Sequence, residues 1–338
     1  MIDGSGTDRA RCVLAPNPSL ITLDGTNTWL VAEPGSATAI IVDPGPDDPG
    51  HLRRVQATAA EAGQRIEKIV LTHGHADHSA GARRLAGLTG APVLAVDPAH
   101  RLGPGGLGPG DAVRAGGCEL RVIETPGHTA DSVCLLLESD GALLTGDTVL
   151  GRGTTVIAGD GNLGDYLRSL DRLRALADDA GLQALLPGHG PPLADPARTL
   201  DYYIAHRAQR LAEVQAALAA GCRTLADIVA RAYSDVDRAL WPFAEWSVRA
   251  QLGYLAERGA LPPGMRMPGE LPGAATGQTP GELPGSYRAR LRSRSGSISS
   301  TDLGCSAIQP RATKSARALL TVSRDAPTSW ASSSWVRS

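Results

Sequence analysis

Four side chains that can bind metal ions occur within six consecutive residues, His73-Gly74-His75-Ala76-Asp77-His78. This segment follows the apolar run Ile69-Val70-Leu71 and precedes a stretch with helical spacing, so its side chains can turn toward two neighbouring points in space. A lone histidine is usually an ordinary surface or core residue, whereas a cluster of this density indicates ligation. Imidazole and carboxylate together suit zinc, and less selectively iron or manganese. We therefore expect a metal site in this loop.

Three later segments repeat one pattern, a His or Asp beside glycine just after a predicted strand. They are Thr125-Pro-Gly-His128-Thr, Thr145-Gly-Asp147-Thr and Leu186-Pro-Gly-His189-Gly. Each segment alone is typical of a turn whose polar residue faces water. Strand ends of one sheet can gather at one edge, however, so ligands that are distant in sequence can converge there. Together with the six-residue cluster, the three segments predict a shared site.

Short β-rich runs and a few helices must position these residues. The predicted strands are Thr28 to Val31, Thr38 to Val42, Ile66 to Leu71, Leu120 to Ile123, Val133 to Leu137, Ala142 to Thr145 and Gln183 to Leu186. Helical spacing occurs over Asp77 to Leu88 and over Leu163 to Leu176. The fold class is α/β or α+β with a mixed sheet.

From Asp201 the pattern becomes helical. Apolar residues between Ile204 and Leu218 fall on one helix face, and Gly221 ends the run. Thr224 opens a capping box for a helix over Leu225 to Tyr233, and a third helix is predicted over Ser247 to Arg258. These helices predict a small helical or winged-helix appendage.

The chain of 338 residues therefore divides into three predicted parts: a catalytic domain over 1–200, an appendage over 201–262 and a tail over 263–338. The tail repeats Pro-Gly-Glu-Leu-Pro-Gly from Pro268 and from Pro280, and is rich in Ser and Arg. We expect it to be disordered, with a mistranslated extension as the alternative. It is basic whereas the rest is acidic, which argues against bulk binding of the main body to nucleic acid or anionic membranes.

The five cysteines are scattered, without a C-x-x-C pair or a preceding signal peptide. This distribution predicts a reduced, cytoplasmic protein. No apolar run approaches the roughly 18 residues that a membrane helix needs, so we expect no membrane anchor.

With these motifs the sequence resembles the metallo-β-lactamase superfamily, whose signature is the H-x-H-x-D-H motif followed by His, Asp and His on later loops. The resemblance implies an αββα sandwich with the metal site at one edge of its two sheets. It implies one zinc ion on His73, His75 and His128, a second on Asp77, His78 and His189, and Asp147 as the bridge between them.

The implied chemistry is hydrolysis. Two zinc ions roughly 3.5 to 4 Å apart can share a hydroxide, because metal binding lowers the pKa of water from about 15.7 to about 7. A metal-bound hydroxide would attack an ester, thioester or phosphodiester bond. Asp77 is either a proton shuttle or only a ligand, and both roles stay open.

Further segments resemble the β-lactamase-like protein 2 family, over about residues 12 to 260. They are Gly25 to Val31, Gly146 to Thr155, Pro187 to Pro191 and Tyr203 to Arg207. Asp147 stands where zinc β-lactamases commonly carry a Cys ligand, and the inserted domain of the β-CASP branch is missing, so neither activity is expected. The family often carries Asp-His after Thr-Pro-Gly-His-Thr, whereas this chain has Ala130-Asp131-Ser132. This difference argues against assigning the family's substrate directly to this chain.

Members of this family are described as ribonucleases for single-stranded RNA, and relatives are thioesterases on acyl carriers. The resemblance thus implies a small-molecule ester or thioester, or single-stranded RNA, as substrate. Candidate substrate contacts are Arg152, Thr154, Thr155, Arg207 and Arg210, although each is equally explained as an ordinary loop or helix residue. A DNA-reading winged helix would be basic, and this appendage carries balanced charges, which argues against DNA. A non-catalytic protein that binds RNA or a partner is the rival, and the sequence predicts no oligomeric state.

Overall fold

Two five-stranded sheets face each other in the part of the chain that the computed structural model describes, residues 2–263 and 265. The first sheet has the order β1-β2-β3-β4-β5 and the second the order β10-β9-β8-β7-β6. The strands are β1 (Ala10–Leu14), β2 (Asn27–Val31), β3 (Thr38–Val42), β4 (Arg65–Val70), β5 (Val93–Leu94), β6 (Ala112–Ala115), β7 (Cys118–Glu124), β8 (Val133–Leu137), β9 (Ala142–Gly146) and β10 (Ala184–Pro187).

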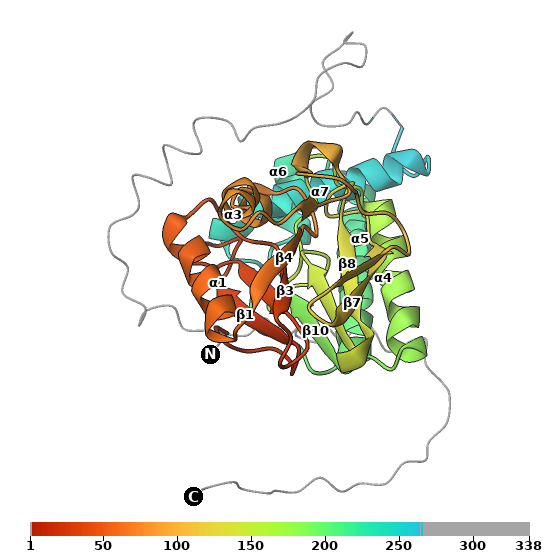
Figure 1. The fold of residues 1–338 in the computed structure, drawn as a ribbon. Coiled ribbons are helices and arrows are strands. Elements are labelled where there is room, and N and C mark those ends of the chain that lie inside the picture. Colours follow the sequence, from red (N-terminus) through yellow and green to blue (C-terminus); the bar gives the residue numbers. More distant parts are fainter. Residues whose placement is uncertain (1, 264, 266–338) are drawn as a thin grey trace, which may run out of the picture. The chain divides into compact units, whose positions relative to one another are not determined.

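Helices cover the outer face of each sheet, which gives four layers (Figure 1). The α-helices are α1 (Pro49–Glu61), α2 (Ala76–Ser79), α3 (Ala82–Thr89), α4 (Leu163–Asp179), α5 (Pro196–Ala219), α6 (Leu225–Ala232) and α7 (Trp241–Glu257). α1 and α3 pack on the first sheet, and α4 and the first half of α5 pack on the second. This is the predicted αββα sandwich.

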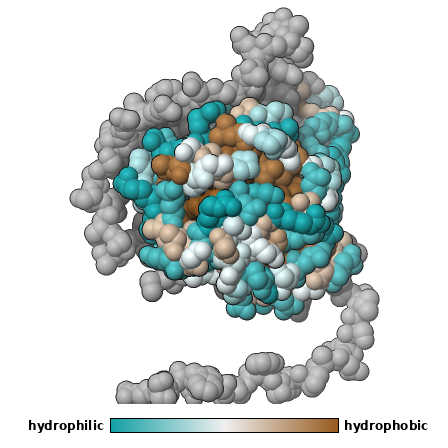
Figure 2. All heavy atoms as spheres, in the orientation of Figure 1, coloured by the Kyte–Doolittle hydropathy of each residue, from teal (hydrophilic) through white to brown (hydrophobic). Residues whose placement is uncertain are grey.

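Alternation along the strands explains the layers. In β8, Val133, Leu135 and Leu137 point into the core between the sheets, whereas Cys134 and Leu136 point toward α4. A strand with apolar residues on both faces is buried on both faces, so these strands read as continuous apolar runs. Hydrophilic residues instead cover most of the face drawn in Figure 2.

The expected mixed pairing is present in both sheets. β3 pairs parallel with β4, and β9 with β10, while β7, β8 and β9 are successively antiparallel. The carboxyl ends of β3 and β4 therefore lie at one edge of the first sheet, and those of β7, β9 and β10 at one edge of the second. Every predicted ligand follows one of these ends.

The prediction of one helix over Asp77 to Leu88 is wrong in one respect, because the structure divides it into α2 and α3. The amide of Gly81 donates to the carbonyl of Gly45 at 2.9 Å, and the amide of Gly45 donates to the carbonyl of His78 at 3.1 Å. The loop after β3 thus takes hydrogen bonds that a continuous helix would make with itself.

The second half of α5 belongs to another core. Val214, Ala217 and Leu218 of α5 pack with buried residues of α6 and α7, and Thr224 caps α6 by accepting from the amide of Asp227 at 3.2 Å. Residue 200, the predicted domain boundary, lies inside α5, which continues from one core into the other. The predicted tail lies outside the described residues apart from Pro263 and Met265. No helix in the described part of the chain is both long and apolar enough to cross a membrane.

Candidate metal centre

Three histidines from two sheets form the first group of candidate ligands. His73 and His75 lie in the loop after β4, and His128 lies in the turn after β7. Nδ1 of His75 is 3.1 Å from Nε2 of His73 and 3.0 Å from Nε2 of His128. These three nitrogens can bind one metal ion, as the family resemblance implies.

Asp77, His78 and His189 form the second group. Nε2 of His189, which follows β10, is 3.2 Å from Nε2 of His78 and 3.2 Å from Oδ2 of Asp77. Oδ2 of Asp77 is also 3.6 Å from Nε2 of His78. Two imidazole nitrogens at this distance, with a carboxylate oxygen beside them, fit a common cation.

Asp147 lies between the two groups. Its Oδ2 is 3.7 Å from Nε2 of His128 in the first group and 3.4 Å from Nε2 of His189 in the second. Its Oδ1 is buried without a hydrogen-bond partner among the described residues, and the nearest ring nitrogen, Nε2 of His78, is 3.4 Å away. Because a buried carboxylate oxygen without a partner is costly, its position suits a metal ligand. The residues present therefore fit metal binding, and Asp147 lies within reach of both ligand groups.

Four of the five candidate histidines are held by their second ring nitrogen. The Nδ1 contacts are His73 with Oγ1 of Thr72 at 3.0 Å, His78 with Oδ2 of Asp43 at 3.0 Å, His128 with the carbonyl of Val156 at 2.8 Å and His189 with the carbonyl of Gly25 at 3.1 Å. Such contacts fix the ring orientation and the tautomer, which leaves Nε2 with a free lone pair for a metal.

Asp43 is a residue of this site that was not predicted from the sequence. Its carboxylate accepts from the amide of Thr72 at 2.8 Å and from its hydroxyl at 2.7 Å, in addition to contacting His78. Asp43 is buried and has a φ of 52°, a conformation that is uncommon outside glycine. Asp-Pro-Gly after a strand was the available signal, but it does not reveal the contact with His78.

The two groups differ in their electrostatics. Burial lowers the pKa of His73 well below its usual value and lowers that of His128 to about 4, so these rings are neutral and ready to bind a metal. Burial also disfavours the charged forms of His78 and His189, but neighbouring carboxylates, above all Asp147, outweigh it and raise the pKa of His189 to about 9 and that of His78 well above its usual value. The carboxylates of the second group thus attract positive charge.

Gly188 permits the close approach of Asp147 and His78. A Cβ at this position would lie 2.6 Å from Oδ1 of Asp147 and 2.7 Å from Cε1 of His78. Packing therefore explains the glycine in the Pro-Gly-His-Gly segment, because a larger residue would collide with Asp147 and His78.

Three of the five predicted substrate contacts, Thr155, Arg207 and Arg210, are buried and bonded to the protein. The hydroxyl of buried Thr155 donates to the main-chain carbonyl of Asp147, and the guanidinium of buried Arg207 donates to the carbonyl of Thr155. Arg152 is exposed and ion-paired with Asp24, and Thr154 is half-buried. Arg210 is buried and bonds Glu213, Asp235 and the carbonyl of Ala232.

A cavity of about 470 Å³ opens beside His75. His100, in the 3-10 turn Pro98–His100, lines it, and a Cβ on Gly74 would lie only 2.6 Å from Nε2 of His100. His100 was not predicted from the sequence as a site residue, because its neighbours in space come from other segments.

Comparison with known proteins agrees with this geometry. The model of the metallo-β-lactamase superfamily matches residues 21–189, which include all seven candidate ligands. The chain belongs to this superfamily. The model of the beta-lactamase associated winged helix domain matches residues 224–260, which contain α6 and α7. The superfamily membership and the appendage were both predicted.

Curated relatives of this superfamily chain include the Beta-lactamase-like protein 2 homolog of Drosophila melanogaster, which is 31% identical over 267 residues, covering 74% of this chain and 88% of the relative. The Thioesterase pkgB of Emericella nidulans is 34% identical, covering 61% of this chain and 58% of that protein. A metallo-beta-lactamase family protein from Thermus thermophilus has a solved structure with a TM-score of 0.61 and 25% identity, covering 74% of this chain and 94% of that one.

Proposed function

We propose that the chain is a hydrolase with two zinc ions that cleaves a thioester or carboxylic ester. The observation that carries this proposal is the position of Asp147, whose carboxylate lies within 3.7 Å of ring nitrogens from both ligand groups. A donor set of imidazoles and carboxylates supports zinc, with iron and manganese as alternatives. The superfamily consists generally of hydrolases, and one relative is named a thioesterase.

The two ligand groups, the cavity beside His75 and Asp147 would each have a separate role in hydrolysis. Metal ions held by the two groups would lower the pKa of a coordinated water toward 7 and polarise the substrate carbonyl. The cavity beside His75 would admit the ester to the open side of the first group, because His75 is exposed whereas His73 and His128 are buried. Asp147, whose main-chain carbonyl accepts a hydrogen bond from Thr155, would connect the two ligand groups.

Asp77 serves better as a ligand than as a proton shuttle. Its Oδ2 lies 3.2 Å from Nε2 of His189 and 3.6 Å from Nε2 of His78, beside the other atoms of the second ligand group. A carboxylate next to a cation is held in its charged form and is a weak base. Its side chain is 28% exposed, so solvent can reach its second oxygen while Oδ2 faces His189.

RNA is the less favoured substrate. The cavity lining contains neither Lys nor Arg, and two of the predicted phosphate contacts, Arg207 and Arg210, are buried and bonded to the protein. A phosphodiester backbone would need positive charge near the metals. We therefore place single-stranded RNA second, DNA below it, and propose no membrane partner. We also propose a reducing, cytoplasmic compartment, supported by the free cysteines Cys12, Cys118, Cys134 and Cys222.

A substrate panel with and without chelator tests this function. Metal-analysed protein should hydrolyse thioesters or esters, chelation should stop the reaction, and zinc should restore it. His75→Ala and Asp147→Ala should abolish turnover while circular dichroism shows the fold retained, and His206→Ala, outside the two ligand groups, should behave as the parent chain. Full activity of both ligand variants would overturn the proposal.

The non-catalytic rival gives a different result in the same panel. It requires RNA binding that is independent of metal, without turnover of any ester, thioester or phosphodiester. RNA binding should be measured on the full chain and on residues 1–265, because the basic excess of the sequence lies in the tail. Binding that disappears with the tail belongs to the tail and gives no support to the rival.

A further inference from the structure

The cavity beside the first ligand group brings together four separate segments of the chain. They are the ligand loop, the segment at the 3-10 turn, the turn that follows His128, and the loop before α4. The lining residues are Gly74, His75, Val96, Asp97, Pro98, His100, Thr129, Ala130, Asp131 and Asp160. Because His75 is both a candidate ligand and part of the lining, a group in this cavity lies next to the reacting bond of a substrate at the metals.

Three of the lining side chains are carboxylates, Asp97, Asp131 and Asp160, and each is bonded only to a neutral donor. Oδ1 of Asp97 accepts from the amide of Ala99 at 2.8 Å, and Oδ1 of Asp131 accepts from the hydroxyl of Thr129 at 2.7 Å. Oδ2 of Asp160 accepts from the amide of Ala130 at 3.2 Å. None of the three forms an ion pair with a described residue, so their negative charge is not compensated.

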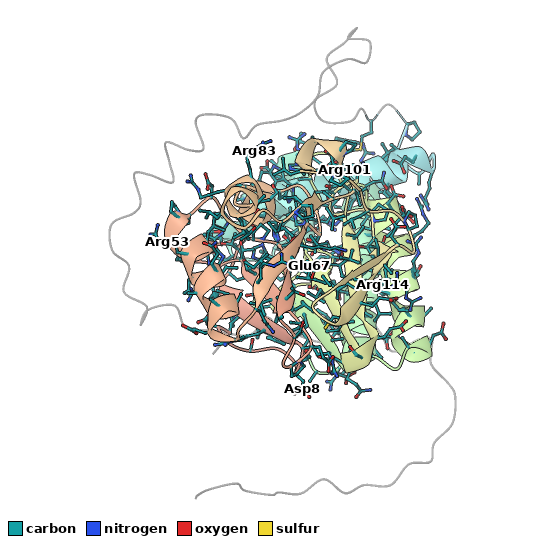
Figure 3. The ribbon with its side chains drawn as sticks, viewed as in Figure 1. Asp8, Arg53, Glu67, Arg83, Arg101 and Arg114 are labelled. Carbon is teal, nitrogen blue, oxygen red and sulfur yellow. The ribbon has the colours of Figure 1, made fainter. Side chains whose placement is uncertain are left out.

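The nearest arginine in sequence does not supply the missing charge. Arg101 follows the 3-10 turn (Figure 3), but its guanidinium bonds to the carbonyls of Ala95 and Val96, and it is not among the lining residues. Carboxylates that line a concave surface next to low-dielectric protein concentrate the negative potential inside it. The three carboxylates therefore disfavour an anionic group in this cavity and favour a cationic one, against the positive charge that metal ions at His75 would add.

We propose that this cavity receives the part of the substrate next to the scissile bond, and that Asp97, Asp131 and Asp160 select a neutral or cationic group there. This inference rests on the proposed esterase or thioesterase function and specifies its substrate class. Thioesters of small neutral or cationic thiols are substrates, whereas carriers that bring phosphate groups to the cavity, such as coenzyme A, are selected against.

Three acetyl thioesters with different leaving groups test the selection: acetylthiocholine is cationic, S-acetyl-N-acetylcysteamine is neutral and acetyl-coenzyme A is anionic. We expect kcat/KM to be highest for the cationic or neutral thioester and lowest for acetyl-coenzyme A. Added salt should lower kcat/KM for acetylthiocholine and leave the neutral thioester almost unchanged, because salt screens the attraction.

Asp131→Asn and Asp97→Asn separate charge from shape. Both keep an oxygen that can accept the existing hydrogen bond, and Asn caps a turn as well as Asp does. In each variant the ratio of kcat/KM for acetyl-coenzyme A to that for acetylthiocholine should rise about threefold to tenfold. This ratio cancels differences in the amount of active enzyme. Asp8→Asn, an exposed position drawn at the opposite end of the molecule from Arg101, should leave the ratio unchanged (Figure 3).

The outcomes separate this inference from the function on which it rests. Hydrolysis of all three thioesters with a ratio that both Asn variants leave unchanged overturns the inference and leaves the function standing. A parent enzyme that prefers acetyl-coenzyme A also overturns it. Absence of metal-dependent hydrolysis of every ester and thioester overturns both.

Discussion

Arg207 on α5 donates a hydrogen bond to the main-chain carbonyl of Thr155. The hydroxyl of Thr155 in turn donates to the carbonyl of Asp147, the residue between the two ligand groups. Further along the same helix, Val214 and Leu218 belong to the core of the appendage. α5 thus connects the appendage to the loop that carries Asp147. Arg207 and Thr155 both donate hydrogen bonds to main-chain carbonyls.

Replacing Arg207 should therefore weaken metal binding. Arg207→Met leaves the buried carbonyl of Thr155 without its donor and removes the guanidinium from the Tyr166 ring, whose centre is 5.0 Å away. We expect the affinity for metal and kcat/KM to fall about 10- to 100-fold, as is usual when the support of a ligand is lost. Titration with cobalt, followed by its visible absorption, measures the affinity without turnover.

Arg152→Met is the matched control, because Arg152 is exposed and paired only with Asp24. It should leave cobalt affinity within about twofold of the parent. If Arg207→Met instead keeps full cobalt affinity but raises KM alone, Arg207 contacts substrate and the structural role is refuted.

Asp43→Asn should weaken the second ligand group selectively. Asn tolerates the positive φ of residue 43 and can still accept from Thr72, but it no longer places a negative charge beside Nδ1 of His78. Loss of such a carboxylate–histidine contact costs about 10- to 100-fold in metal affinity. Cobalt titration should show one site near the parent affinity and one weakened site. Asp48→Asn, at the cap of α1, should change neither, and equal weakening of both sites would argue against a role confined to His78.

The sequence predicts the elements whose pattern is purely local. β3 and β8 have the predicted bounds, because each is a short, continuous apolar run that ends at polar residues or a turn. The two-residue β5 and the mixed sequence of β1 carry no such pattern, and α1 was missed although its buried residues Leu52, Val55 and Ala59 have helical spacing. Pairing with neighbouring strands and packing on a sheet stabilise these elements, and neither is visible in a single segment.

In the candidate site, too, only residues with a local sequence pattern could be predicted. The seven ligand candidates were recognisable because their types and spacing are rare in combination, and the structure gathers all seven. Asp43 and His100 were missed as site residues, since their contacts with His78 and Gly74 join segments far apart in sequence. Arg207 was named for its charge, but only the fold shows that it is buried.

Metal removal should lower the thermal stability of the whole sandwich. The candidate ligands come from both sheets, so bound metal ions would cross-link the loops after β4, β7, β9 and β10. A ligand at about a thousand times its Kd stabilises by about 4 kcal/mol, which corresponds to roughly 10 °C in Tm for a domain of this size. Calorimetry with chelator and then with zinc measures this shift. His75→Ala should show a smaller shift than the parent, and an unchanged Tm on chelation would mean that metal does not connect the sheets.

Gly188→Ala should damage the centre with a single methyl group. The added Cβ would lie 2.6 Å from Oδ1 of Asp147 and 2.7 Å from Cε1 of His78, so the loop or both ligands must move. We expect cobalt affinity to fall at least about tenfold, because ligand positions tolerate shifts of only a fraction of an ångström. Gly87→Ala on α3 is the matched control, since nothing lies within 4 Å of its added Cβ and alanine favours a helix. Gly87→Ala should keep parental cobalt affinity and gain up to about 1 kcal/mol in unfolding free energy. Parental cobalt affinity in Gly188→Ala would show that Asp147 and His78 are not packed against this glycine.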